Sequence, residues 1–450
     1  MHILIKNAKI IDPTSSFFLQ KTHLWIANGT IQALGDDVDL LPEKTPDVVL
    51  KAADYSNWLA EHSAENAFAE ASFFMVIEAE GCSISPGWFD LKANFGFPEF
   101  DYREDAESLA RTALAGGFTG AAVYASGRPY SDDVAAFELL QKKLQAQIPD
   151  FLPVMGVSKN NEHQVLSELM ELEEVGTKVF GDLGKTISDT AFLKRLMQYS
   201  RGLDAPLLLS SQDSYLSQGG QMNEGKANVE LGLKGIPKMA ETIALFTQLQ
   251  LLNYTQSKVH FTALTLAESF EKVKTAAQNG LAATASCSIF NLGYTDEGLS
   301  NYDTYLKQSP PLRDGHEQKQ LIEALLSGKV DAIISNHQPL EEDLKNCEFE
   351  YAQAGSISLQ TFFPMLLAAV GRQNFEEKLI PILVENPRKI LGLTVPKLQE
   401  GCGADLILLD FEQKWTLDDA SNQSKSSNSP LWGKSLKGKV LGGMKQNRLF

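Results

Sequence analysis

The chain has 450 residues, of which 43% are hydrophobic, and it carries a formal net charge of −17. This length and apolar share allow one barrel-sized domain with a smaller companion and a large core. The acidic excess argues against a surface that binds nucleic acid or an anionic membrane, because both need Lys and Arg in excess. We therefore expect neither kind of partner.

Cysteine use and hydropathy indicate the compartment. The four cysteines are far apart and form no C-x-x-C pair: Cys82, Cys287, Cys347 and Cys402. A structural zinc site is therefore not expected, and a reducing environment is the default. No apolar run approaches the ~20 residues of a membrane span, and the N-terminus is more typical of a first strand than of a secretory signal. We expect a cytoplasmic protein.

Both ends of the chain contain short apolar runs separated by turn signals. Near the N-terminus, two such runs flank Asn28 and Gly29, a dipeptide typical of a two-residue β-hairpin turn. A similar run, GADLILLD, lies at 403–410 and is followed by a second hairpin pattern. We predict that residues 1–55 and 395–450 together build a small β-sandwich domain.

The middle of the chain has a different pattern. Residues 51–75 are rich in Ala and predict a helical insertion, whereas 80–394 alternate apolar strands with amphipathic helices. Such alternation is typical of parallel α/β domains, and about eight units fit, which favours a (β/α)₈ TIM barrel. After a first strand in SPGWFDL, the expected strands are 118–126, 150–157, 176–182, 206–211, 258–264, 281–287 and 330–336.

Active sites of such barrels lie at the C-terminal ends of the strands. Residues i and i+2 of a strand share a face, so Lys92 and Asn94 are expected to point into one site. The candidate pocket residues at the strand ends are Lys92, Asn94, Ser126, Asp182, Ser210, Asn291, Asn336 and His337. Catalytic zinc needs three His, Cys or carboxylate ligands, and only His337 among seven histidines is well placed.

Ordered segments between Glu78 and Asp410 resemble motifs of the dihydroorotase branch of the amidohydrolase superfamily, metal-dependent hydrolases of pyrimidine synthesis. The family pattern P-G-x-x-D-x-H-x-H-x-R corresponds to Pro86–Gly96, which reads PGWFDLKANFG. Further segments that resemble family motifs are Ala115–Thr119 (AGGFT), Phe180–Gly184 (FGDLG), Gly219–Gly225 (GGQMNEG), Lys307–Arg313 (KQSPPLR), Asn336–Leu340 (NHQPL) and Asn386–Leu393 (NPRKILGL).

The departures from these motifs fall on the residues that the resemblance assigns to chemistry. Lys92 and Asn94 replace the first two histidine ligands, and of the paired acids only Asp182 remains, beside Leu183. Other family ligands are replaced by Ser210, Ala263 and Asn336, the last at the position of the general base. Residues at the substrate-recognition positions are Gly96, Ser126 and Leu340.

The resemblance therefore implies a barrel that has lost its metal chemistry. Zinc lowers the pKa of bound water to about 7, and an amide such as Asn336 accepts no proton in place of a general base. We expect no zinc, no other cofactor and no dihydroorotase turnover. Lys92 is expected to supply positive charge near Asp90 or Asp182, where a metal would otherwise lie.

Purely structural roles for the same residues stay open as alternatives. Lys92 and Asn94 are also typical of residues that form hydrogen bonds at a barrel mouth without contacting a ligand. His337 is also typical of a structural histidine, and Asp90 of an acid that binds backbone or loop groups.

Three functions are compatible with the sequence. The first is a catalytically silent dihydroorotase homologue with a structural or regulatory role, and the resemblance implies aspartate carbamoyltransferase as its partner and a homo-oligomer as its state. The second is an active cyclic-amide hydrolase that uses Lys92, Asp182 and His337 without metal. The third is a small-molecule binding protein that uses the vacated pocket.

Overall fold

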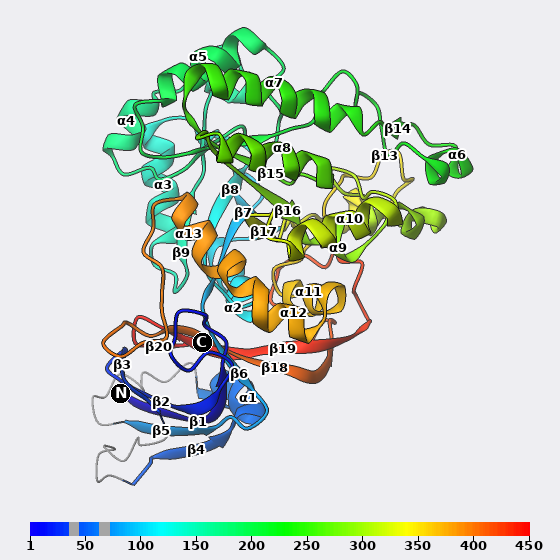
Figure 1. Cartoon of the computed structure of the whole chain (residues 1–450). Coiled ribbons are helices and arrows are strands. Elements are labelled where there is room, and N and C mark those ends of the chain that lie inside the picture. The colour runs from blue at the N-terminus through cyan, green and yellow to red at the C-terminus, as the bar shows by residue number, and fades with distance from the viewer. Residues whose placement is uncertain (36–44, 63–72) are drawn as a thin grey trace.

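The computed structural model describes residues 1–35, 45–62 and 73–450. Parallel strands and their connecting helices form the larger body, and strands from both chain ends form a smaller one beneath it (Figure 1). The fold class expected from strand–helix alternation is confirmed: the chain is a (β/α)₈ TIM barrel with a β-sandwich domain built from both ends.

The barrel wall consists of two parallel sheets of six and three strands within the described residues. Strands β9 and β10 follow one another directly, and a parallel bridge from Ala93 to His337 joins the remaining edges, so eight strands close the barrel. Its strands are β7 (Trp88–Pro98), β8 (Phe118–Ser126), β9 (Asp150–Pro153), β10 (Met155–Gly156), β11 (Phe180–Gly181), β12 (Leu207–Ser210), β15 (Lys258–Thr262), β16 (Ala282–Ser288) and β17 (Ala332–Ile334).

Helices cover the outside of the barrel and connect its strands. The α-helices are α2 (Ala106–Ala115), α3 (Val134–Leu144), α4 (Leu169–Glu174), α5 (Thr190–Ser200), α6 (Lys226–Leu231), α7 (Met239–Thr255), α8 (Ala267–Gln278), α9 (Ile289–Gly293), α10 (Gly315–Leu326), α11 (Phe362–Val370), α12 (Arg372–Asn374) and α13 (Asn386–Ile390). Two π-helical turns lie at Phe375–Leu379 and Pro381–Glu385, and a short strand pair, β13 (Met222–Asn223) and β14 (Gly235–Ile236), lies outside the barrel.

The small domain is one continuous sheet whose two layers enclose a separate core. Ile3 and Ile77 from one layer pack in the same apolar cluster as Leu406 and Met444 from the other. Its strands are β1 (His2–Ile10), β2 (Lys21–Ala27), β3 (Thr30–Gly35), β4 (Val48–Lys51), β5 (Phe74–Glu78), β6 (Ser83–Pro86), β18 (Asp405–Thr416), β19 (Ser435–Lys445) and β20 (Arg448–Leu449).

Two predicted boundaries of these domains differ from the structure. Residues 83–86 form β6, which pairs with β1 and β18, so the chain leaves the small sheet after Pro86 rather than at residue 80. Within the predicted helical insertion 51–75, helix α1 spans Ala52–His62 and strand β5 begins at Phe74. Residues 63–72 of that prediction lie outside the described residues.

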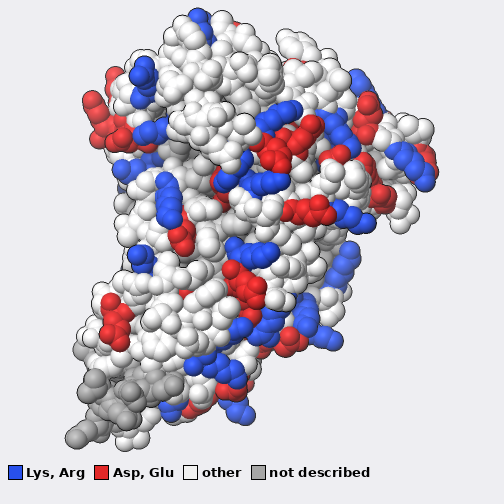
Figure 2. All heavy atoms as spheres, viewed as in Figure 1, with Lys and Arg blue, Asp and Glu red and all other residues white. Residues whose placement is uncertain are grey.

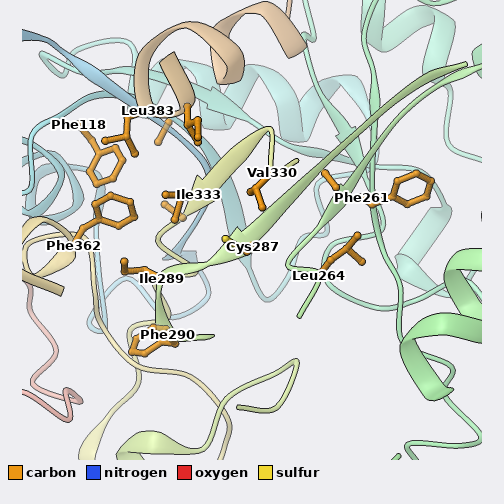
Figure 3. Packing of buried hydrophobic residues seen from close by; sticks show 14 of the residues in the cluster. Phe118, Phe261, Leu264, Cys287, Ile289, Phe290, Val330, Ile333, Phe362 and Leu383 are labelled. Atoms are coloured by element: carbon orange, nitrogen blue, oxygen red, sulfur yellow. The ribbon is translucent and has the colours of Figure 1, made fainter. Parts of the chain in front are cut away.

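Large apolar side chains fill the space between the barrel strands and their helices. Phe118 of β8 and Phe362 of α11 meet edge to face with ring centroids 4.9 Å apart (Figure 3). The buried Trp88 ring lies 5.9 Å from the Phe118 ring in the same cluster. This packing holds the strands in place, and thereby fixes where their C-terminal ends meet.

Acidic and basic side chains are interspersed over the face shown in Figure 2, and its upper part carries few charges. In the ranges that the structure describes, every helix is too short or too polar to cross a membrane.

Candidate functional site

A cavity of about 520 Å³ opens at the C-terminal ends of the barrel strands. Its wall includes residues from β7, from the ends of β12 and β15, and from the loops after β10 and β11; they include Lys92, His163, Ser210, Gln212, Thr262 and Ala263. Parallel strands bring their C-terminal ends to one side, so residues more than 170 positions apart share this wall. The cavity is the candidate site.

Lys92 reaches this cavity from the middle of β7. Its side chain is only 8% exposed, and no carboxylate of the described residues lies within 4.0 Å of its Nζ atom. The carboxyl groups of Asp90 and Asp182 act electrostatically on the Lys92 amine, but neither forms a direct ion pair with it. Burial lowers the pKa of Lys92, and this effect outweighs the opposing attraction of the two carboxylates.

Asp182 follows β11 and lies beneath the cavity wall rather than in it. One carboxylate oxygen accepts hydrogen bonds from the Gly184 backbone at 3.0 Å and the Ser210 hydroxyl at 3.1 Å, and the other accepts from the Ser210 backbone at 2.6 Å. Burial nevertheless raises the pKa of Asp182 to about 6. These bonds tie the end of β11 to the end of β12.

Asp90 accepts hydrogen bonds that hold neighbouring backbone segments together, as its structural interpretation predicts. One of its carboxylate oxygens accepts from the Lys92 backbone at 3.1 Å and the Ser335 backbone at 3.0 Å, and the other accepts from the Ser335 hydroxyl. Burial raises the pKa of Asp90, while these hydrogen bonds act in the opposite direction. Asp90 thus joins β7 to the segment after β17 and offers no oxygen to the cavity.

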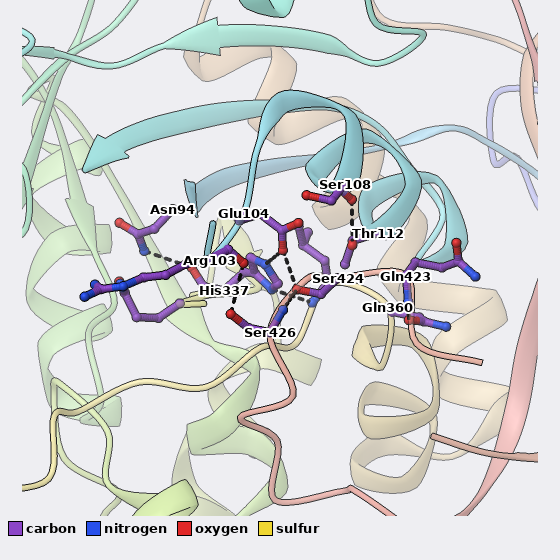
Figure 4. Close-up of polar contacts among 12 residues, drawn as sticks. Asn94, Arg103, Glu104, Ser108, Thr112, His337, Gln360, Gln423, Ser424 and Ser426 are labelled. Atoms are coloured by element: carbon purple, nitrogen blue, oxygen red, sulfur yellow. Dashed lines mark hydrogen bonds and ion pairs between the residues drawn. The ribbon is translucent and has the colours of Figure 1, made fainter. Parts of the chain in front are cut away.

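Asn94 and His337 meet each other outside the cavity wall (Figure 4). The Asn94 amide donates to the His337 carbonyl at 2.9 Å. The His337 ring is fully buried: Nδ1 accepts from the Ser358 backbone at 3.0 Å, and Nε2 lies 3.3 Å from Glu104. Lys92 and Asn94 were expected to share one site. The Asn94 side chain instead bonds to the segment after β17, outside the cavity wall.

The remaining predicted residues also lie outside the residues that line the cavity. Ser126 ends β8, where its carbonyl accepts from the Glu99 backbone at 3.4 Å. Asn291 lies in α9 and donates to the Pro311 carbonyl at 3.0 Å, whereas Asn336 donates to the Ser309 carbonyl at 3.4 Å. Of the eight predicted pocket residues, the cavity wall therefore includes Lys92 and Ser210, with Asp182 directly behind Ser210.

Three strand tips share an unusual backbone conformation. Leu183, Ala263 and Asn336 have φ values of 48°, 57° and 51°, in the left-handed region. Such a conformation costs about 1 kcal/mol or more for a residue with a side chain, and it is concentrated at functional sites. These are three of the positions at which the family resemblance places metal chemistry. None of the three residues has a His, Cys or carboxylate side chain.

The side chains at the strand tips do not fit a divalent metal. Lys92 is a cation or a neutral amine, Ala263 and Leu183 have no donor atom, and Asp182 is occupied by three hydrogen bonds. In the part of the chain that the structure describes, no three His, Cys, Asp or Glu side chains are placed to hold one ion.

Sequence reasoning missed two polar residues of the cavity wall. His163, expected in a helical or loop context, is buried, and its Nε2 atom has no hydrogen-bond partner among the described residues; the same holds for Gln212 Oε1. Burial lowers the pKa of His163 to about 4, and nearby Lys185 contributes. Both residues lie in loops, where no periodicity indicates the direction of a side chain.

Comparison with known proteins gave consistent relatives. Residues 81–269 match the family described as dihydro-orotase-like. The chain is 30% identical to the dihydroorotase of Syntrophus aciditrophicus, over 100% of this chain and 99% of that protein. It is 31% identical to the dihydroorotase of Caldicellulosiruptor saccharolyticus, over 96% and 95% of the two chains.

Solved structures show the same fold at lower sequence identity. The L-hydantoinase of Arthrobacter aurescens superposes with a TM-score of 0.79 at 19% identity, covering 99% of this chain and 95% of that one. The dihydropyrimidinase of Brevibacillus agri gives a TM-score of 0.77 at 18% identity, covering 100% and 95%. Barrel and small domain therefore recur together in these proteins.

Proposed function

The chain belongs to the dihydroorotase family, and on this premise we propose that it is a cytoplasmic member which does not hydrolyse dihydroorotate and has a structural or regulatory role in pyrimidine synthesis. The observation that carries the proposal is the set of side chains at the strand tips. Lys92, Ala263 and Asn336 supply neither a zinc ligand nor a general base, and Asp182 is held by hydrogen bonds from Gly184 and Ser210.

A repurposed hydrolytic site has less support from the geometry. It would need Lys92, Asp182 and His337 to face one bound amide. The cavity wall includes Lys92, but the three hydrogen bonds of Asp182 hold it behind Ser210. The His337 ring lies against Glu104 and the Ser358 backbone, outside that wall. We therefore place the alternative of an active cyclic-amide hydrolase second.

The hydrolytic part of the proposal is tested on the purified full-length protein. It is incubated with excess zinc, freed of unbound metal, and measured for metal content and for hydrolysis of dihydroorotate. We expect far less than one zinc per chain and no turnover above the uncatalysed rate. The dihydroorotase of Syntrophus aciditrophicus serves as a positive control in the same assay. Stoichiometric zinc together with turnover would overturn the proposal.

The role that we propose is support of aspartate carbamoyltransferase, with this chain as a homo-oligomer. Sedimentation of this protein alone, of the transferase from the same organism alone, and of their mixture tests both statements. We expect the mixture to contain a larger species and the transferase to unfold at a higher temperature when this protein is present. Unchanged sedimentation and unchanged unfolding temperature of the transferase would contradict the role.

A further inference from the structure

Lys92 is a buried amine without a hydrogen-bond acceptor. Within the described parts of the chain, its Nζ atom makes no hydrogen bond and has no carboxylate within 4.0 Å, yet it lines a cavity of about 520 Å³. Buried lysines are almost always paired, because an unpaired ammonium loses its hydration without compensation. An uncompensated amine at a cavity wall therefore requires an explanation.

The groups that face Lys92 leave its amine available. The Tyr124 ring lies on one side, 5.9 Å from Nζ. The carboxylates of Asp90 and Asp182 act on Lys92 from a distance, but their oxygens are occupied by hydrogen bonds from Ser335 and Ser210. Because neither carboxylate holds the ammonium directly, the neutral amine loses no close ion pair when it forms.

Burial and the two carboxylates act on Lys92 in opposite directions. Burial is the larger effect and lowers the pKa of Lys92. At a given pH, a lysine whose pKa is lowered has more of its amine in the neutral form, which is a nucleophile toward carbonyl carbon. The cavity wall carries charges of both signs, from Lys185 and from Glu162 and Asp189, and the carboxyl groups of Asp90 and Asp182 lie near Lys92. An anionic ligand is therefore disfavoured beside Lys92, and an uncharged one fits.

We propose that Lys92 captures a small, uncharged aldehyde or ketone in this cavity as an imine. The nitrogen lone pair attacks the carbonyl carbon and forms a C–N bond, while the π electrons move to the oxygen. The nitrogen gives up its two protons to that oxygen, which leaves as water as the C=N bond forms. The step is a condensation and needs no oxidant or reductant. It goes beyond the proposed function and is independent of it.

The cavity has room and polar groups for this chemistry. A volume of about 520 Å³ is within the range of small-molecule sites. Ser210 and Thr262 place hydroxyls in its wall, and the buried Nε2 atom of His163 has no partner among the described residues. These groups are available to hydrogen-bond the carbonyl oxygen and the water that leaves. The small side chain of Ala263 leaves space beside them.

The experiment traps the imine with propanal and sodium cyanoborohydride and measures propyl labelling of each lysine by peptide mass spectrometry. Lys185 is the matched internal control, because it lines the same cavity but is exposed and donates to the Asn161 carbonyl at 3.0 Å. At pH 7 we expect Lys92 to be labelled at least about tenfold faster than Lys185, because burial lowers the pKa of Lys92 and leaves more of its amine neutral.

Variants and denaturation complete the test. Lys92→Met should remove the fast label, and Lys194→Met, at an exposed position of α5 outside the cavity wall, should leave it unchanged. In urea the preference should disappear, because it depends on burial rather than on the neighbouring sequence. The peptide measurement needs only the wild-type chain, so it stands even if Lys92→Met fails to fold. Labelling of Lys92 no faster than Lys185 in the folded protein would overturn the proposal.

Discussion

At the scale of single residues, a titratable side chain buried in the barrel, His260, has a structural role. His260 of β15 is fully buried, with Nδ1 2.9 Å from the Thr284 hydroxyl and Nε2 3.0 Å from the Ser286 hydroxyl. Burial lowers the pKa of His260 to about 3. No carboxylate appears among its hydrogen-bond partners in the described residues, so the ring joins β15 to β16 as a neutral group.

The lowered pKa of His260 predicts a contribution to acid sensitivity. The unfolded ring binds a proton below about pH 6.5, whereas the folded ring stays neutral down to about pH 3, so stability is lost as the pH falls through this window. The loss approaches about 1.4 kcal/mol per pH unit. Urea denaturation of wild type and His260→Gln at pH 7.5, 6.0 and 5.0 measures it.

The expected result for His260→Gln is a weaker dependence of the unfolding free energy on pH than in wild type. His316→Gln is the control, since His316 is exposed on α10 and its replacement should keep the wild-type dependence. Parallel curves for wild type and His260→Gln would show that the His260 ring is not held neutral in the folded protein.

At the scale of elements, the sequence patterns located strands and helices better than their ends. The apolar run 118–126 is strand β8 over its full length, but the run 176–182 yields only Phe180–Gly181. Gly176 at the start of that run has a φ of 105°, which a regular strand does not adopt. The Leu-rich stretch 242–252 lies within α7, which begins at Met239.

The predicted hairpin turn is confirmed, because the residues that favour a turn are adjacent in the sequence. Asn28 and Gly29 have φ values of 50° and 75°, as a two-residue hairpin between β2 and β3 requires. Strand β7, in contrast, shows register shifts against β8, which periodicity does not reveal. These irregularities are set by pairing with neighbouring strands. They help to explain why Lys92 and Asn94 diverge although they are two residues apart.

At the scale of the whole molecule, a buried lysine joins the small domain to the barrel. Lys445 of β19 is 3% exposed and donates to the Thr119 carbonyl and to Asp150, both at 2.6 Å, and its ammonium lies 3.6 Å from Asp405. Arg388 reinforces the same boundary by donating to the Gly87 carbonyl at 2.8 Å. The contacts tie β18 and β19 to the base of the barrel.

Replacing Lys445 should therefore weaken the whole fold. Lys445→Met leaves buried acceptors unpartnered, and we expect a loss on the order of 2–3 kcal/mol; the loss is smaller than for a fully buried pair because Asp150 is half exposed. Lys437→Met is the control: its ion pair with Glu412 is exposed and screened by water, so its removal should change stability little. Equal unfolding free energies of the two variants in urea would contradict this account of the boundary.

The sequence by itself predicted the barrel and determined which side-chain types stand at its strand ends. Periodicity is a local property, and the residue types at 92, 94, 183, 210, 263 and 336 are fixed by the chain whatever its fold. Only the tertiary structure decided which side chains face the cavity. Asn94 and His337 bond to each other, Asp90 and Asp182 bind neighbouring strands, and Lys92 remains among polar groups of distant loops. The physical reason is that hydrogen-bond partners and burial are set by residues far away in sequence.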